Sequence, residues 1–214
     1  MVPHSFQPPD NEAIARALAA YGIRAANDQV AQVRSYMTLL LRWNEKLNIT
    51  ATHDPQEILV RHFCESMYAV ASGGIEGGRL ADVGSGGGFP GLPIKIIVPA
   101  LEVSLIEANR KKAVFLAEVV RSLGLTHVQV EAKRYQELGA GAPLDYVCAR
   151  ALGGYDQLLG WASSSAGART AILWLGAGEV KRAMQITGWG WRKPVTLPQS
   201  RGRFLLIGDS LRSV

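Results

Sequence analysis

The glycine-rich stretch at residues 84–91 constrains the fold of this chain more than any other feature. It reads Gly-Ser-Gly-Gly-Gly-Phe-Pro-Gly and follows a short apolar run at residues 79–83. Glycines such as Gly84 and Gly86 permit positive φ angles and let a ligand lie against the backbone. A helix that begins near residue 91 would direct its free N–H groups at this loop. The pattern predicts a strand, a ligand-binding turn and a helix in succession.

Strands alternate with helices in the apolar periodicity that follows this loop. Further strands are expected at residues 102–107, 126–131, 144–149 and 170–175, and helices at residues 91–98, 110–123, 155–165 and 178–187. Two more strands, at residues 189–197 and 203–208, close the chain without a helix between them. This order predicts an α/β fold with a mostly parallel, doubly wound sheet that ends in a C-terminal antiparallel hairpin.

The first 75 residues have a different, helical pattern. Helices are expected at residues 11–22, 28–47 and 54–72. The third has a strong start, because Asp54 can cap the helix and Pro55 suits its first position. We therefore expect a helical N-terminal extension over residues 1–75 and an α/β core over residues 76–214.

Composition excludes several classes of protein. The chain has 214 residues, of which 48% are hydrophobic, so it can bury a core and is not mostly disordered. No apolar run approaches the roughly 20 residues needed to span a bilayer, and residues 1–10 do not resemble a signal peptide. Two distant cysteines argue against a disulfide framework and favour the cytoplasm. The histidines lack metal-ligand spacing, so no metal is expected.

Positive charge is concentrated at the C-terminal end of the chain. Residues 1–180 carry 16 basic and 17 acidic side chains, whereas residues 181–214 carry seven basic side chains and one acidic side chain. Such an end suits an anionic partner, with nucleic acid favoured over a membrane surface, although a merely solvated surface is the alternative.

The sequence of the glycine loop is compatible with two kinds of nucleotide cofactor. The spacing Gly-x-Gly-x-x-Gly at residues 86–91, with Glu107 about 20 residues later, matches the dinucleotide fingerprint and would suggest a nicotinamide-dependent oxidoreductase. However, Asp82 lies at the strand end, where a carboxylate suits a cofactor that carries an ammonium group. Asp-x-Gly-x-Gly after a strand, at residues 82–86, resembles the motif of class I S-adenosylmethionine-dependent methyltransferases.

The flanking segments extend this resemblance over about residues 35–208. They comprise Trp-Asn-Glu-Lys-Leu-Asn-Ile-Thr at residues 43–50, Arg-His-Phe at 61–63, Gly-Phe-Pro-Gly-Leu-Pro at 88–93, Arg-Lys-Lys at 110–112 and Arg-Ala at 150–151. In this order and spacing, the series resembles the bacterial 16S rRNA guanine-N7 methyltransferase family, also called glucose-inhibited division protein B. The resemblance implies a class I (Rossmann-like) methyltransferase fold, S-adenosylmethionine as methyl donor, and a guanine of 16S rRNA in the small ribosomal subunit as acceptor.

The same resemblance implies which residues bind the cofactor. They are Asp82, Gly84, Ser85, Gly86, Phe89, Glu107, Tyr135, Gln136 and Arg150. Glu107 takes the position of the ribose-binding acid, whereas Tyr135-Gln136 replaces the Ala-Glu of many members beside the adenine. For Arg150, an ion pair with Asp145 or Asp156 is the alternative. This chain also departs from the family at Glu65, where Asp is usual, and at Leu175, where many members have lysine.

The implied chemistry needs no catalytic residue in the usual sense. Guanine N7 has a free lone pair, so we expect no general base and assign catalysis to positioning. Contacts with RNA are expected from the basic residues Arg110, Lys111, Lys193, Arg201 and Arg203. A monomer is expected. A non-catalytic RNA-binding protein on the same fold is the remaining alternative, since Leu175 replaces the lysine and the C-terminal end is basic.

Overall fold

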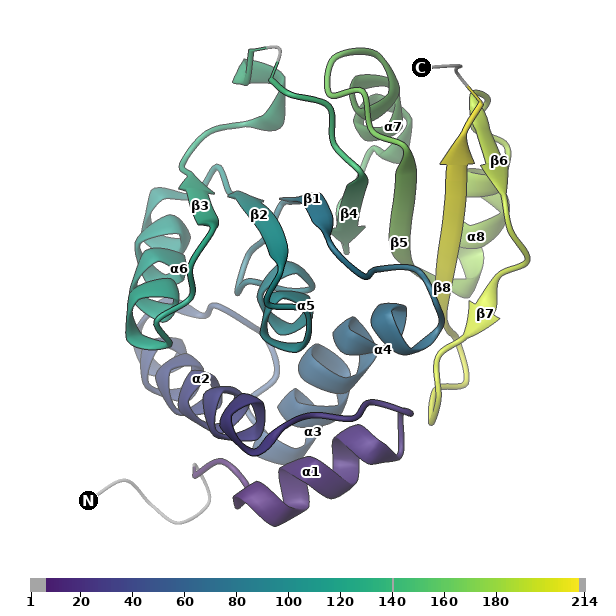
Figure 1. Cartoon of the computed structure of the whole chain (residues 1–214). Coiled ribbons are helices and arrows are strands. Elements are labelled where there is room, and N and C mark those ends of the chain that lie inside the picture. The colour runs from purple at the N-terminus through teal and green to yellow at the C-terminus, as the bar shows by residue number, and fades with distance from the viewer. Residues whose placement is uncertain (1–6, 140, 212–214) are drawn as a thin grey trace.

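One eight-stranded sheet organises the computed structural model, which describes residues 7–139 and 141–211 (Figure 1). Parallel pairing joins five strands in the order β3-β2-β1-β4-β5, and β8 continues the sheet antiparallel to β5. Both β6 and β7 pair with β8. The strands are β1 (Gly78–Val83), β2 (Leu101–Ile106), β3 (Val128–Glu131), β4 (Tyr146–Arg150), β5 (Thr170–Gly176), β6 (Trp189–Trp191), β7 (Val195–Thr196) and β8 (Arg203–Ser210). The predicted α/β fold with a mostly parallel sheet is confirmed.

Helices cover both faces of this sheet (Figure 1). They are α1 (Asn11–Ala19), α2 (Asn27–Leu47), α3 (Pro55–Ile58), the π-helix η2 (Leu59–Cys64), α4 (Glu65–Ala71), α5 (Gly91–Ile97), α6 (Arg110–Ser122), the 3-10 turn η3 (Tyr135–Glu137), α7 (Tyr155–Ser164) and α8 (Ala177–Met184). Alternate strand residues point to opposite faces, so Leu80 packs with the N-terminal helices, α5 and α6, whereas Ala81 packs with α7 and α8.

The N-terminal helices share one hydrophobic core with the sheet. Ile14 of α1, Tyr36 of α2 and Met67 of α4 are fully buried in the same cluster as Leu80 and Leu105 of the sheet. Burial of this kind is the main stabilising term for such a layer. The division into an extension at residues 1–75 and a core at residues 76–214 stays a prediction.

The helix expected at residues 54–72 is present, but its middle is wider than an α-helix. Asp54 accepts a hydrogen bond from the Glu57 N–H at 2.8 Å, and Pro55 takes the first position, as the sequence predicts. The following residues, Leu59–Cys64, form the π-helix η2 before α4 continues the same segment. Such π segments occur frequently at functional sites.

The prediction of one continuous strand at residues 189–197 is wrong. It is divided into β6 and β7, and residues 192–194 between them are not in a strand. Pro194 has no N–H to donate to a neighbouring strand, which explains the interruption. The antiparallel C-terminal arrangement is nevertheless present, because β8 pairs with β5, β6 and β7.

One part of the sheet lacks a covering helix. Within the described residues between β3 and β4, the only helical element is the short turn η3. The sheet face there is open as a groove of about 660 Å³, lined by side chains that include Ala81, Ser104 and Trp161. It follows the face of the sheet rather than the ends of the strands.

No helix within residues 7–139 and 141–211 is both long enough and apolar enough to cross a membrane.

Candidate functional site

The loop after β1 lies at the edge where the parallel strands end, which we call the carboxyl edge. In doubly wound sheets this edge is where ligands bind. Gly84 and Gly86 have φ angles of 72° and 55°, so both adopt the left-handed conformation that the sequence predicts for this turn. The Gly84 N–H donates to the Ile106 carbonyl at 2.8 Å, which fastens the loop to the end of β2.

Glu107 joins the loop to the end of β2. Its Oε2 accepts a hydrogen bond from the Gly86 N–H at 2.8 Å, and its Oε1 accepts one from the Asn109 N–H at 2.7 Å. The side chain is largely buried, with 9% of the residue exposed. The structure therefore brings together Gly86 and Glu107, two of the residues predicted to bind the cofactor.

Asp82 lies beneath the loop and is fully buried. Its Oδ2 accepts a hydrogen bond from the Gly91 N–H at 2.9 Å, which fixes the start of α5, and the carboxyl group also interacts with the buried Cys148 thiol. Burial is the main cause that raises the pKa of Asp82 to about 7, with a smaller contribution from the nearby Glu107 charge. Because Asp82 is fully buried, its predicted direct contact with a cofactor stays a prediction, and what the structure shows is its support of the loop and of the start of α5.

Ser85 contributes to the turn rather than to its surface. It is 1% exposed, and its hydroxyl donates to the Asp82 carbonyl at 2.8 Å. Its backbone carbonyl accepts the Gly88 N–H at 2.7 Å, which closes the turn. A contact of the predicted kind between Ser85 and a cofactor would therefore involve its backbone.

Phe89 directs its ring into an aromatic cluster of the N-terminal helices. The ring stacks on Tyr36 with centroids 5.5 Å apart and on His62 with centroids 4.7 Å apart, and meets Phe63 edge-on. Only 7% of Phe89 is exposed. Its ring therefore anchors the loop, and the predicted cofactor contact is left to its backbone.

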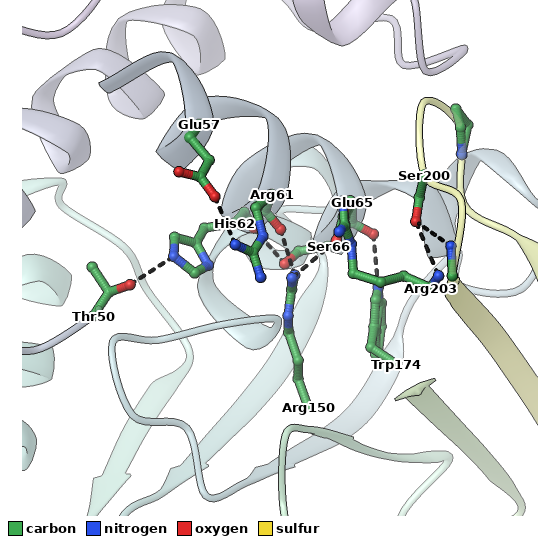
Figure 2. A network of polar contacts seen from close by, with 12 residues as sticks. Thr50, Glu57, Arg61, His62, Glu65, Ser66, Arg150, Trp174, Ser200 and Arg203 are labelled. Atoms are coloured by element: carbon green, nitrogen blue, oxygen red, sulfur yellow. Dashed lines mark hydrogen bonds and ion pairs between the residues drawn. The ribbon is translucent and has the colours of Figure 1, made fainter. Parts of the chain in front are cut away.

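Arg150 ends β4 at the carboxyl edge, where it enters a network of polar contacts (Figure 2). Its guanidinium donates to Glu65 Oε2 at 2.9 Å and to the Arg61 carbonyl. The alternative prediction of an ion pair with Asp145 or Asp156 is wrong, because the partner is Glu65. The partner comes from a segment 85 residues earlier in the chain, so local sequence did not reveal it.

Glu65 is the centre of this network. The carboxylate is fully buried and also accepts hydrogen bonds from Arg203 Nε and Nη2 at 2.8 and 2.6 Å, while its backbone carbonyl accepts from Trp174 Nε1 at 2.7 Å. Figure 2 shows the two arginines approaching Glu65 from different strands. Two guanidinium groups compensate the charge of one buried carboxylate, as buried ions require.

Tyr135 and Gln136 lie in η3, which follows the end of β3. The Tyr135 ring packs edge-on against Trp161 at 5.2 Å between centroids, whereas Gln136 is exposed. Their predicted contact with the adenine stays a prediction.

The basic residues predicted to bind RNA are distributed over two places. Arg110 and Lys111 begin α6 directly after β2 and are exposed, and Arg201 lies in the turn before β8, whose first residue, Arg203, pairs with Gly176 at the end of β5. These four therefore lie along the carboxyl edge. Lys193 lies between β6 and β7, along the outer border of the sheet. Arg203 is already bound to Glu65, so it is less free to contact phosphate than its sequence position suggests.

For His62, beside Arg61, the sequence leaves open both a contact with RNA phosphate and a helix-surface or capping role. Its Nε2 lies 2.8 Å from Thr50 Oγ1, and its Nδ1 is buried without a partner. Burial first, and then the Arg150 and Arg61 charges, lower its pKa to about 3, so the ring is neutral at physiological pH. The segment Arg-His-Phe pointed to this position, but its stacking on Phe89 depends on the fold.

Metal-ligating side chains do not gather among the described residues. No group of three or more His, Cys, Asp or Glu side chains has an arrangement that could hold a metal ion in that part of the chain. Cys64 and Cys148 are free thiols in the core, and burial raises the pKa of both.

Comparison with known proteins finds one family over most of the chain. The model of the family described as rRNA small subunit methyltransferase G matches residues 29–185. A ribosomal RNA small subunit methyltransferase G from Xylella fastidiosa is 46% identical over 123 residues, which cover 58% of this chain and 57% of that protein. A protein of the same name from Sorangium cellulosum is 43% identical over 149 residues, covering 66% and 62% respectively. The matched part thus spans less than two thirds of these relatives.

Solved structures with this fold include known methyltransferases. A SAM-dependent methyltransferase from Aquifex aeolicus superposes with a TM-score of 0.61 at 17% identity, over 80% of this chain and 98% of that chain. A ribosomal protein L11 methylase from Lactobacillus delbrueckii subsp. bulgaricus gives 0.58 at 13% identity, over 71% and 80%. The predicted class I methyltransferase fold is confirmed.

Proposed function

Because the chain belongs to the rRNA small subunit methyltransferase G family, we propose that it transfers a methyl group from S-adenosylmethionine to N7 of a guanine in 16S rRNA. The observation that carries the proposal is the glycine loop at residues 84–91, which we call the ligand loop, at the carboxyl edge. There the left-handed Gly84 and Gly86 and the buried carboxyl groups of Asp82 and Glu107 come together. These features suit an adenosine cofactor with a charged amino acid tail better than a pyrophosphate.

The donor is held by the loop and by the ends of the neighbouring strands. The backbone at residues 84–86 supports it, Glu107 binds the ribose hydroxyls, and Tyr135 and Gln136 border the adenine. Arg150 contributes by holding the strand end in place, since its guanidinium is committed to Glu65 and Arg61. S-adenosylmethionine supplies an electrophilic methyl group when bound.

The protein's own task is to place the acceptor. Guanine N7 needs no deprotonation, so no side chain has to act as a general base. Holding N7 in line with the methyl group can supply roughly 7–11 kcal/mol of the barrier reduction. The exposed Arg110, Lys111 and Arg201, which lie along the carboxyl edge, bind the RNA backbone and deliver the base to this edge.

The activity is tested with labelled S-adenosylmethionine and small ribosomal subunits from a strain that lacks this methyltransferase. We expect label in 16S rRNA, recovered as 7-methylguanine at one guanine. Absence of label, or label on another base, would contradict the proposal. Titration with S-adenosylhomocysteine and with NADH separates it from the oxidoreductase alternative, which predicts tighter binding of NADH.

A variant of the loop tests where the donor binds. Gly84→Asp adds a side chain that begins 2.9 Å from Leu152 Cδ1 and introduces a negative charge into the loop. We expect at least tenfold weaker binding of S-adenosylhomocysteine and loss of methylation, measured by calorimetry and label transfer. Gly124→Asp is the matched control, since Gly124 also has a positive φ angle and a Cβ there has open space away from the loop. Equal effects of both variants would contradict the placement.

A further inference from the structure

A stack of aromatic rings leads from the core to the carboxyl edge. Tyr36 is fully buried and lies almost parallel to Phe89, with 6° between the ring planes. Phe89 in turn stacks on His62, with 21° between the planes. His62 is the only one of the three that is not in the buried class, so the stack ends there.

The surroundings of His62 contain two buried polar atoms without a partner. Its Nδ1 and the Nε of the adjacent Arg61 are buried and have no hydrogen-bond partner, although buried polar groups are normally paired. Both residues lie in the π-helix η2, next to the strand end that carries Arg150. The ligand loop lies directly against them, because Phe89 belongs to it.

We propose that His62 is a stacking platform for the acceptor guanine, which continues the stack of Tyr36 and Phe89 outward. This rests on the proposed function and names the part of the site that receives the substrate base. Enzymes that act on a single base take it out of its helix and stack it on aromatic side chains, including histidine.

The charge state of His62 suits this task. Methylation at N7 leaves a positive charge on the guanine ring, which a protonated imidazole against its face would oppose. Burial and the Arg61 and Arg150 charges hold the pKa of His62 near 3, so the ring stays neutral throughout the reaction. The ring itself therefore adds no positive charge to that of the neighbouring Arg61 and Arg150.

The structural alternative is that His62 serves only to bond Thr50. The stacking role and the hydrogen-bonding role predict that different variants stay active. His62→Phe keeps a neutral aromatic ring and removes the bond to Thr50, whereas His62→Gln keeps an amide in reach of Thr50 and removes the ring. Thr50→Val removes the same bond without changing the ring.

Single-turnover methylation of small subunits is measured for the wild type and the three variants, together with S-adenosylhomocysteine affinity. Since base stacking contributes on the order of ten- to a hundredfold in binding, we expect His62→Gln to lose that much in rate at limiting RNA. His62→Phe and Thr50→Val should stay within about threefold of wild type by the same reasoning. Cofactor affinity, measured without RNA, should change much less than the methylation rate in all three, because the loop is also anchored by Tyr36 and Phe63 through Phe89.

The reverse order, with His62→Gln active and the other two impaired, would overturn the inference, as would three equal rates. If the two His62 variants fold poorly, Thr50→Val decides between the two roles. A ten- to hundredfold loss of methylation rate in Thr50→Val would assign the role of His62 to its hydrogen bond with Thr50, whereas a rate near that of wild type supports stacking. The wild-type product is identified first. A product other than 7-methylguanine contradicts the proposed function, whereas a correct product with the wrong variant order contradicts only this inference.

Discussion

Individual side chains at the carboxyl edge are held in unusual states by burial. Asp82 has no exposed surface, and His62 has one buried nitrogen without a partner. Burial shifts their pKa values in opposite directions, to about 7 for Asp82 and about 3 for His62, because it favours the neutral form of each. Both groups therefore link the stability of the fold to pH.

The pKa shift of Asp82 predicts that this residue makes the fold less stable as pH rises. Between the ordinary pKa of 3.8 and the raised pKa of about 7, the unfolded chain has released a proton that the folded chain keeps. The contribution of Asp82 is thus complete below about pH 4 and lost through about pH 7, with a slope of up to about 1.4 kcal/mol per pH unit. Asp82→Asn should remove this slope.

Urea unfolding at about pH 5, 6 and 7 measures the difference between this variant and wild type. Comparison of the two chains cancels the opposite contribution of His62, which both contain. Asp156→Asn, on the exposed surface of α7, controls for the loss of one carboxyl group. If the free energy of unfolding of both variants depended on pH in the same way, the raised pKa of Asp82 would be contradicted.

Residues whose role depends on local sequence were predictable, and those that depend on distant contacts were not. The turn glycines, Asp82 and Glu107 lie within one strand-loop-helix unit and the next strand, so their spacing carried the information. The roles of Glu65 and Trp174 arise from a contact across 109 residues, for which the sequence offers no local signal.

Among the elements, the segment from α3 to α4 connects the N-terminal helices to the sheet. The π-helix η2 precedes Glu65, and two arginines from β4 and β8 meet this residue. The sequence predicted the start of the segment at Asp54 and its extent, because caps and periodicity are local. It did not predict the π-helix, since no residue type marks a six-residue widening of this kind.

Loss of the Glu65 charge should destabilise the fold strongly. Glu65→Gln leaves the guanidinium groups of Arg150 and Arg203 without their carboxylate, and breaking a buried pair in this way costs about 3–5 kcal/mol. Urea unfolding measures the effect. Asp209→Asn removes the partner of Arg192 in a half-exposed ion pair and should cost at most about 1 kcal/mol. Similar losses in both variants would contradict the importance of burial.

Across the whole molecule, the basic side chains are better described by their place in the fold than by their place in the sequence. The charge count directed attention to residues 181–214, but Arg110 and Lys111, from a segment of nearly neutral charge, reach the same edge as Arg201. The net charge of residues 181–214 therefore indicated an anionic partner, but only part of the surface expected to bind it.

Reversal of two charges at the carboxyl edge should weaken RNA binding without affecting the cofactor. Lys111→Glu with Arg201→Glu changes two exposed residues, and avoids Arg203, whose substitution would disturb the buried Glu65. We expect the slope of log affinity against log salt to fall by about 2. Lys181→Glu with Arg182→Glu on α8 makes the same charge change elsewhere and should have a smaller effect. Equal effects would indicate nonspecific attraction.

The anchoring of Phe89 in the N-terminal helices has a consequence for the order of events in a catalytic cycle. The loop proposed to hold the donor and the ring stack proposed to face the acceptor share this residue, so we expect a displacement of one to affect the other. RNA and S-adenosylhomocysteine should then alter each other's affinity by the same factor, on the order of fivefold or more. Paired titrations measure this factor in both directions, and independent binding would contradict it. If the coupling is found, the spent donor and the modified RNA would each be held more or less tightly according to whether the other is still bound.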